Sequence, residues 1–168
     1  MHKIKALVLY SSTNTNQTFS YQIGWPTALK NNNLFDCHLL NISSYRYRSK
    51  LLNLLSIKMR MVNCILIMHS VFSNSNKLGK GWIYKTLLDT NIPKIYFIGN
   101  EYKLMPEKME FSKELQISML VSQSNSKEIH EIYEKELSCK IIGLPNTGID
   151  PSIFKPLTES DNREIDIG

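Results

Sequence analysis

Two titratable residues in this chain stand where a parallel sheet would carry out chemistry. His69 directly follows the apolar run 62–68, and Glu101 comes shortly after the apolar run 94–98. An imidazole at the end of a strand can orient or deprotonate a hydroxyl group near neutral pH, and a carboxylate can act as a base or bind sugar hydroxyls. We treat both as candidate catalytic residues. The alternatives are that His69 only caps its strand and that Glu101 pairs with Lys103 on the surface.

Small polar residues follow five of the expected strands. Open α/β sheets bind ligands beyond the carboxyl ends of their strands, so these side chains are expected to converge at one edge. Such a group of donors and acceptors suits a polyhydroxylated ligand, although loops are polar in most proteins. The candidate substrate-binding residues are Ser11, Asn14, Ser70, Asn100, Gln123 and Asn146.

The elements that must position these residues alternate between strands and helices. Apolar runs predict six strands, at residues 4–10, 35–42, 62–68, 94–98, 117–122 and 139–144. Helical spacing fills the intervals between them. The alternation predicts a doubly wound, mostly parallel, six-stranded Rossmann-like sheet in a three-layer α/β/α arrangement. We expect the strand order 3-2-1-4-5-6, with the flavodoxin-like order 2-1-3-4-5 as the alternative.

Composition excludes several classes of protein. A length of 168 residues with 42% hydrophobic content allows one α/β domain with a sizeable core. No apolar run approaches the ~20 residues that cross a bilayer, and no signal peptide is visible, so we expect a cytoplasmic protein. Cys37, Cys64 and Cys139 are far apart in apolar runs, which indicates buried free thiols rather than a metal site or disulfides. The net charge of +5 permits an anionic partner without selecting one.

Two further segments bear on partners. Residues 11–16 contain no glycine, so both the dinucleotide-binding and the P-loop motifs are absent, which argues against a dehydrogenase or a P-loop phosphotransferase.

Residues 45–60 are basic and amphipathic. Such a helix can lie on an anionic membrane or contact RNA phosphates, or it can simply pack on the core with a solvated basic side. We expect no nucleic-acid partner and keep peripheral membrane contact through residues 45–60 as a possibility.

The pattern of residues 143–168 predicts the end of one domain and the start of another. Residues 143–156 predict the end of a strand, a tight turn and one helical turn, with Asp150 as the cap and Pro151 at the first helical position. Residues 157–162 form a polar linker, and 163–168 begin an alternating apolar strand. We therefore expect a domain over residues 1–156, with 157–168 as the linker and start of a second domain.

The run Pro145-Asn146-Thr147-Gly148-Ile149-Asp150-Pro151, followed by Phe154 and Pro156, resembles the interdomain hinge of GT-B fold glycosyltransferases. The closest similarity is to family-4-like and spore-maturation-type enzymes, whose hinge is commonly Pro-Asn-Gly-Val-Asp; here Thr147 is an additional residue.

The resemblance implies the N-terminal, acceptor-side domain of a glycosyltransferase that moves a sugar from a nucleotide sugar to a glycan, lipid or protein acceptor. It also implies catalysis without a metal or cofactor, a second Rossmann-like domain that holds most of the nucleotide sugar, and no activity of this part alone. In this family a histidine placed like His69 often faces a sugar. The alternative is a non-catalytic flavodoxin-like or sugar-binding domain.

Overall fold

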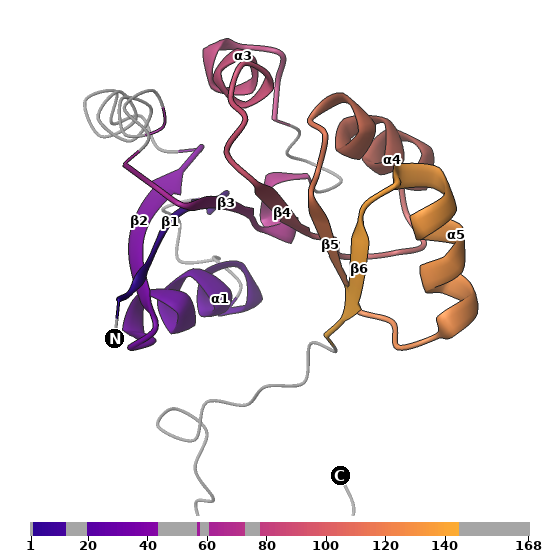
Figure 1. Ribbon diagram of the computed structural model, residues 1–168, viewed down its shortest axis with the longest axis horizontal. Helices are drawn as coiled ribbons and strands as arrows, with labels where there is room; N and C mark the ends of the chain where they lie inside the picture. The colour runs from indigo at the N-terminus through magenta and orange to yellow at the C-terminus, as the bar shows by residue number, and fades with distance from the viewer. Residues whose placement is uncertain (1, 13–19, 44–56, 58–60, 73–77, 145–168) are drawn as a thin grey trace, which may run out of the picture.

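The computed structural model describes residues 2–12, 20–43, 57, 61–72 and 78–144 (Figure 1). The strands in these ranges are β1 (Ile4–Tyr10), β2 (Phe35–Asn41), β3 (Cys64–Ile67), β4 (Lys94–Phe97), β5 (Met119–Ser122) and β6 (Lys140–Gly143). The helices are α1 (Ser20–Asn31), α3 (Trp82–Leu88), α4 (Met105–Glu114) and α5 (Lys127–Leu137), with a 3-10 turn, η1 (His69–Val71), directly after β3.

The six strands form one sheet in which every neighbouring pair is parallel. The sequence-based prediction of a six-stranded, parallel, Rossmann-like α/β fold is therefore confirmed.

The expected strand order 3-2-1-4-5-6 is wrong, because the sheet runs β2-β1-β3-β4-β5-β6 and β3 pairs with β1. Burial explains the difference. All four residues of β3 are buried, so this strand needs a neighbour on each side, whereas β2 exposes Asp36 and His38 and suits an edge. The first five strands follow the flavodoxin-like order that the sequence left as the alternative.

The direction of winding decides which helix covers which face. The chain steps outward from β1 to β2 and then proceeds the other way from β3 to β6. Because strand–helix–strand crossovers are right-handed, this reversal places α1 on one face and α3, α4 and α5 on the other (Figure 1). The sheet is thus the middle of three layers.

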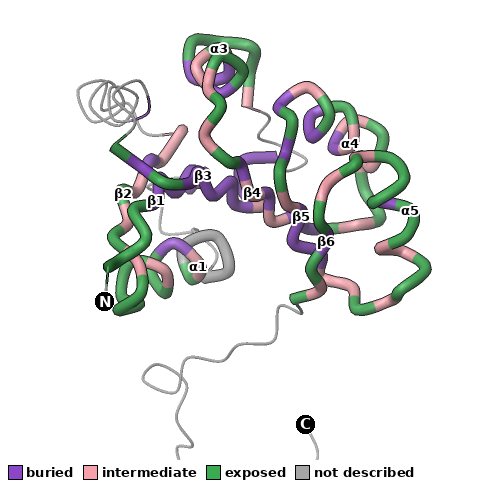
Figure 2. The backbone as a smooth tube through the Cα atoms, viewed as in Figure 1, coloured by how far each residue is buried: buried purple, intermediate pink, exposed green. Residues whose placement is uncertain are grey.

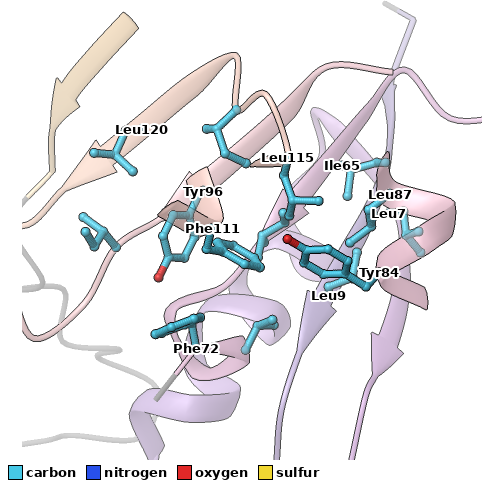
Figure 3. Packing of buried hydrophobic residues seen from close by; sticks show 14 of the residues in the cluster. Leu7, Leu9, Ile65, Phe72, Tyr84, Leu87, Tyr96, Phe111, Leu115 and Leu120 are labelled. Carbon is cyan, nitrogen blue, oxygen red and sulfur yellow. The ribbon is translucent and has the colours of Figure 1, made fainter. Parts of the chain in front are cut away.

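The larger core lies beneath α3, α4 and α5. Phe111 of α4 is at its centre, with its ring centroid 5.4 Å from those of both Phe72 and Tyr96 (Figure 3). The smaller core lies beneath α1, where the ring of Trp25 approaches that of Phe97 to 5.4 Å. Figure 2 shows the central strands as the most continuously buried part of the chain.

The three cysteines are free thiols, as the sequence predicts. Cys64 is buried, Cys37 and Cys139 are partly buried, and burial raises the pKa of all three. In the part of the chain that the structure describes, no helix has both the length and the apolar character needed to cross a membrane.

Candidate functional site

A cavity of about 530 Å³ opens at the carboxyl ends of β4 and β5. Three of the residues predicted to bind substrate or act on it, Asn100, Glu101 and Gln123, line it together. The other lining residues are Tyr102, Met105, Ser124, Ile129, Ile132 and Tyr133. The cavity therefore joins a polar end, made by the strand termini, to an apolar wall made by α4 and α5.

Glu101 accepts hydrogen bonds from three residues at the polar end of the cavity. The Ser122 hydroxyl lies 3.0 and 2.9 Å from the two carboxylate oxygens, the backbone N–H of Gln123 donates at 2.5 Å, and the Tyr133 hydroxyl donates at 2.7 Å. Glu101 is thus bonded to β5 and α5 rather than to Lys103, whose ammonium lies 5.5 Å from the centroid of the Tyr102 ring. This carboxylate fixes the loop after β4 while one side of it faces the cavity.

Two buried tyrosines, Tyr133 and Tyr96, interact with the Glu101 carboxylate. Burial, followed by the hydrogen bond to Glu101, raises the pKa of Tyr133, and burial together with the Glu101 charge raises the pKa of Tyr96. Both phenols therefore stay protonated, and the Tyr133 hydroxyl donates to the carboxylate. The Tyr96 hydroxyl is buried and has no hydrogen-bond partner among the described residues.

Lys108, near the start of α4, is hydrogen-bonded to the backbone of the same loop. Its side chain is only 2% exposed, and its ammonium donates to the carbonyl oxygens of Gly99 at 2.5 Å and Asn100 at 2.9 Å. Burial lowers the pKa of Lys108, and the nearby Glu101 and Glu107 oppose that shift. The loop it holds contains Asn100 with a positive φ of 47°.

Sequence reasoning did not identify Lys108 or Tyr133. Nothing in the helical pattern separates Lys108 from the solvated lysines. Tyr133 carried a weak signal, since it is an aromatic residue in a helix otherwise rich in glutamate and lysine.

His69 begins η1 and packs against the backbone of Gly99. A Cβ atom added at Gly99 would lie 2.8 Å from the His69 Cβ, so only glycine allows this approach. Burial, assisted by the positive charge of Lys108, lowers the pKa of His69 and favours the neutral imidazole. A neutral imidazole is the form that a general base requires, but His69 does not line the cavity and its Nε2 atom is buried.

Ser11 and Ser70 lie at another part of the same edge. The backbone N–H of Ser11 donates to the Ser70 hydroxyl at 3.0 Å, and the hydroxyls of Ser11 and Ser43 are 2.5 Å apart. Both predicted residues are buried, 1% and 2% exposed, so these contacts join the ends of β1, β2 and β3.

The remaining sequence-based predictions fall outside the described residues. These are Asn14, Asn146, the hinge-like run with the domain boundary at 156, and the basic segment 45–60 apart from the buried Ile57. Within the described ranges, no group of three histidine, cysteine or acidic side chains is placed to hold a metal ion.

Comparison with protein-family models, with curated proteins and with solved structures gave no match.

Proposed function

We propose that the cavity at the ends of β4 and β5 binds a hydroxylated ligand, and that this chain is the acceptor-side part of a glycosyltransferase. In this proposal a sugar passes from a nucleotide sugar to a glycan, lipid or protein acceptor, and a second Rossmann-like domain supplies most of the nucleotide site. The observation that carries the proposal is the convergence of Asn100, Glu101 and Gln123 on one cavity. The hinge-like run at residues 145–156 supports the same function.

The chemistry of the cavity fits a sugar or another polyol. Specific small-molecule sites combine apolar walls with a few fixed polar groups, which here are a carboxylate and two side-chain amides. Tyr102, 77% exposed at the rim, adds an aromatic ring. Because the Glu101 carboxylate already accepts from three residues, we assign it the orientation of ligand hydroxyls in preference to their deprotonation.

The direct test is sugar transfer by the full-length protein with a panel of nucleotide sugars and acceptors. We expect Glu101→Gln to lower kcat/KM by tenfold or more. Glu131→Gln, an exposed carboxylate on α5, is the matched control and should leave it unchanged. Residues 1–168 alone should bind acceptor without transferring sugar, because catalysis by two domains requires their closure. The absence of transfer from any donor, or an active Glu101→Gln variant, would contradict the proposal.

A second candidate function is flavodoxin-like binding without catalysis, and the strand order favours it. In the order 2-1-3-4-5 the ligand site lies at the switch point between the first and third strands. Here Ser11, Ser12 and Ser70 mark that position. Titration with FMN distinguishes the two functions, since binding would quench flavin fluorescence. A sugar that binds without any transfer would instead indicate a sugar-binding domain.

A further inference from the structure

A second cavity, of about 590 Å³, lies between α4 and α5 and continues the first. The two share Met105, Ile132 and Tyr133. The second cavity is lined in addition by Pro106, Met109, Glu110, Lys113, Glu114 and Glu136. We call the two together the α4–α5 trough.

The trough changes from polar to apolar along its length. At one end are the Glu101 carboxylate and the Gln123 amide. Tyr133 marks the change, because its hydroxyl donates to Glu101 at 2.7 Å while its side chain lines both cavities. Beyond it, Met105, Met109 and Ile132 supply apolar parts of the wall, beside charged residues of α4 and α5, and Ile132 is 59% exposed to solvent. Covering so exposed an isoleucine side chain with an apolar group is favourable, because it removes apolar surface from water.

Charged residues close the far end. The Lys113 ammonium lies 2.7 Å from the Glu136 carboxylate, so this ion pair bridges α4 and α5. Met105 and Lys113, which both line the trough, are eight helical steps apart on α4, which corresponds to about 12 Å. An apolar chain lying here would have a defined maximum length.

We infer that the ligand of this site is amphipathic, with a hydroxylated head group at Glu101 and Gln123 and a linear aliphatic chain along the α4–α5 trough. This inference rests on the proposed function and narrows it, because it selects a lipid-like acceptor over a glycan or a protein. The polar end excludes a purely apolar ligand, and the ion pair between Lys113 and Glu136 limits the length of the chain.

The test measures binding of alkyl β-glucosides to the protein by calorimetry, below their micelle concentrations. Complete burial of one CH₂ group is worth about a fourfold gain in affinity, so an open trough should yield about twofold per carbon. We expect affinity to rise from methyl to hexyl to octyl glucoside and to level off by dodecyl, where the chain reaches the ion pair.

Substitutions in the trough make the test specific. Ile132→Asp should lower octyl glucoside affinity by at least about tenfold and methyl glucoside affinity by much less, because Ile132 borders both cavities but its exposed side chain would contact the alkyl chain. Leu88→Asp, on α3 and similarly exposed, is the matched control and should change neither. Ile132→Ser provides a milder variant, and thermal melts verify that each protein is folded.

Each alternative outcome is decisive. Equal binding of methyl and octyl glucosides overturns the amphipathic ligand and leaves the proposed sugar site standing. Octyl affinity that is insensitive to both Ile132→Asp and Glu101→Gln indicates nonspecific adsorption and overturns the inference. No binding of any glucoside overturns the inference together with the sugar site. Tight binding to lipid vesicles without any glucoside binding would identify a membrane surface as the partner and also overturn it.

Discussion

Glu101 shows how one side chain connects several parts of this protein. Its carboxylate accepts from Ser122 and Gln123 of the β5 terminus and from Tyr133 of α5, while its backbone belongs to the loop after β4. Hydrogen bonds to a charged acceptor contribute more than neutral ones, about 1.5–3 kcal/mol each. The same contacts that stabilise the loop also fix the polar end of the cavity.

Tyr133→Phe tests this arrangement without disturbing the packing of the ring. The substitution removes one donor to Glu101, and we expect the free energy of unfolding to fall by about 1–2 kcal/mol in urea titrations. Tyr102→Phe is the control, because that ring is 77% exposed and should change stability by less than about 0.5 kcal/mol. Equal effects of the two substitutions would show that the Tyr133 hydroxyl does not hold Glu101.

His69 predicts a pH dependence of stability. Its pKa is lowered in the folded protein, so the unfolded chain takes up this proton first as the pH falls. The stability associated with the neutral imidazole is complete above the ordinary pKa of about 6.5 and is lost as the pH falls through the lower folded value.

Thermal melts from pH 7.5 to pH 5 measure this effect. We expect His69→Gln to flatten the fall in Tm over that range relative to the unsubstituted protein. His38→Gln, an exposed histidine of β2, controls for the loss of an imidazole in general. Parallel curves for the unsubstituted protein and His69→Gln would contradict the assignment.

At the scale of elements, the loop between β4 and α4 is the part that positions the site. Within it, Gly99 packs against His69, and its last residue, Leu104, has a positive φ of 53°. Lys108 then ties the first turns of α4 back to the loop through two carbonyl oxygens. An irregular backbone is held here by a buried ammonium on one side and by Glu101 on the other.

Gly99→Ala should therefore be costly. The new methyl group would lie 2.8 Å from the Cβ of His69, which belongs to a packed turn and cannot swing away. Overpacking of this kind destabilises by about 1–3 kcal/mol, and we also expect weaker ligand binding, because the loop carries Glu101.

The control for Gly99→Ala is a glycine with room for a methyl group. A Cβ at Gly24 of α1 would meet nothing within 4 Å, so Gly24→Ala should be neutral or stabilising by up to about 1 kcal/mol. Calorimetric melts compare the two variants. A neutral Gly99→Ala would mean that η1 can shift away from the β4 terminus.

At the scale of the whole molecule, right-handed winding determines how the sheet is covered. Of the described helices, α3, α4 and α5 share one face and α1 covers the other. The smaller core therefore depends heavily on one helix, whose Trp25 reaches across to Phe97 of β4.

Trp25→Ala tests the contribution of that layer. Replacement of a buried tryptophan costs about 3–5 kcal/mol, and we expect about 2–4 kcal/mol here because Trp25 is only partly buried. Trp82→Ala, at the exposed start of α3, should cost less than about 1 kcal/mol. Chemical denaturation followed by circular dichroism compares them, and a small loss for Trp25→Ala would show that α1 is not a principal support of the sheet.

Much of the fold could be predicted because local patterns dominate it. The fully apolar run that contains β3 and the alternation of strand and helix are properties of contiguous residues, and they led correctly to a parallel six-stranded sheet. The position of β3 beside β1 depends on which edges are buried by distant segments, so the expected strand order was wrong.

The candidate site, like the fold, was predicted from the sequence only in part. Sequence alone placed Asn100, Glu101 and Gln123 at strand ends, because the rule that ligands bind beyond the carboxyl ends of parallel strands needs only strand boundaries. Only the tertiary structure brought these residues to one cavity, buried Ser11 and Ser70, and added Tyr133 and Lys108 to the surroundings of Glu101. Those outcomes depend on side chains that meet across separate elements, and no local pattern encodes such distances.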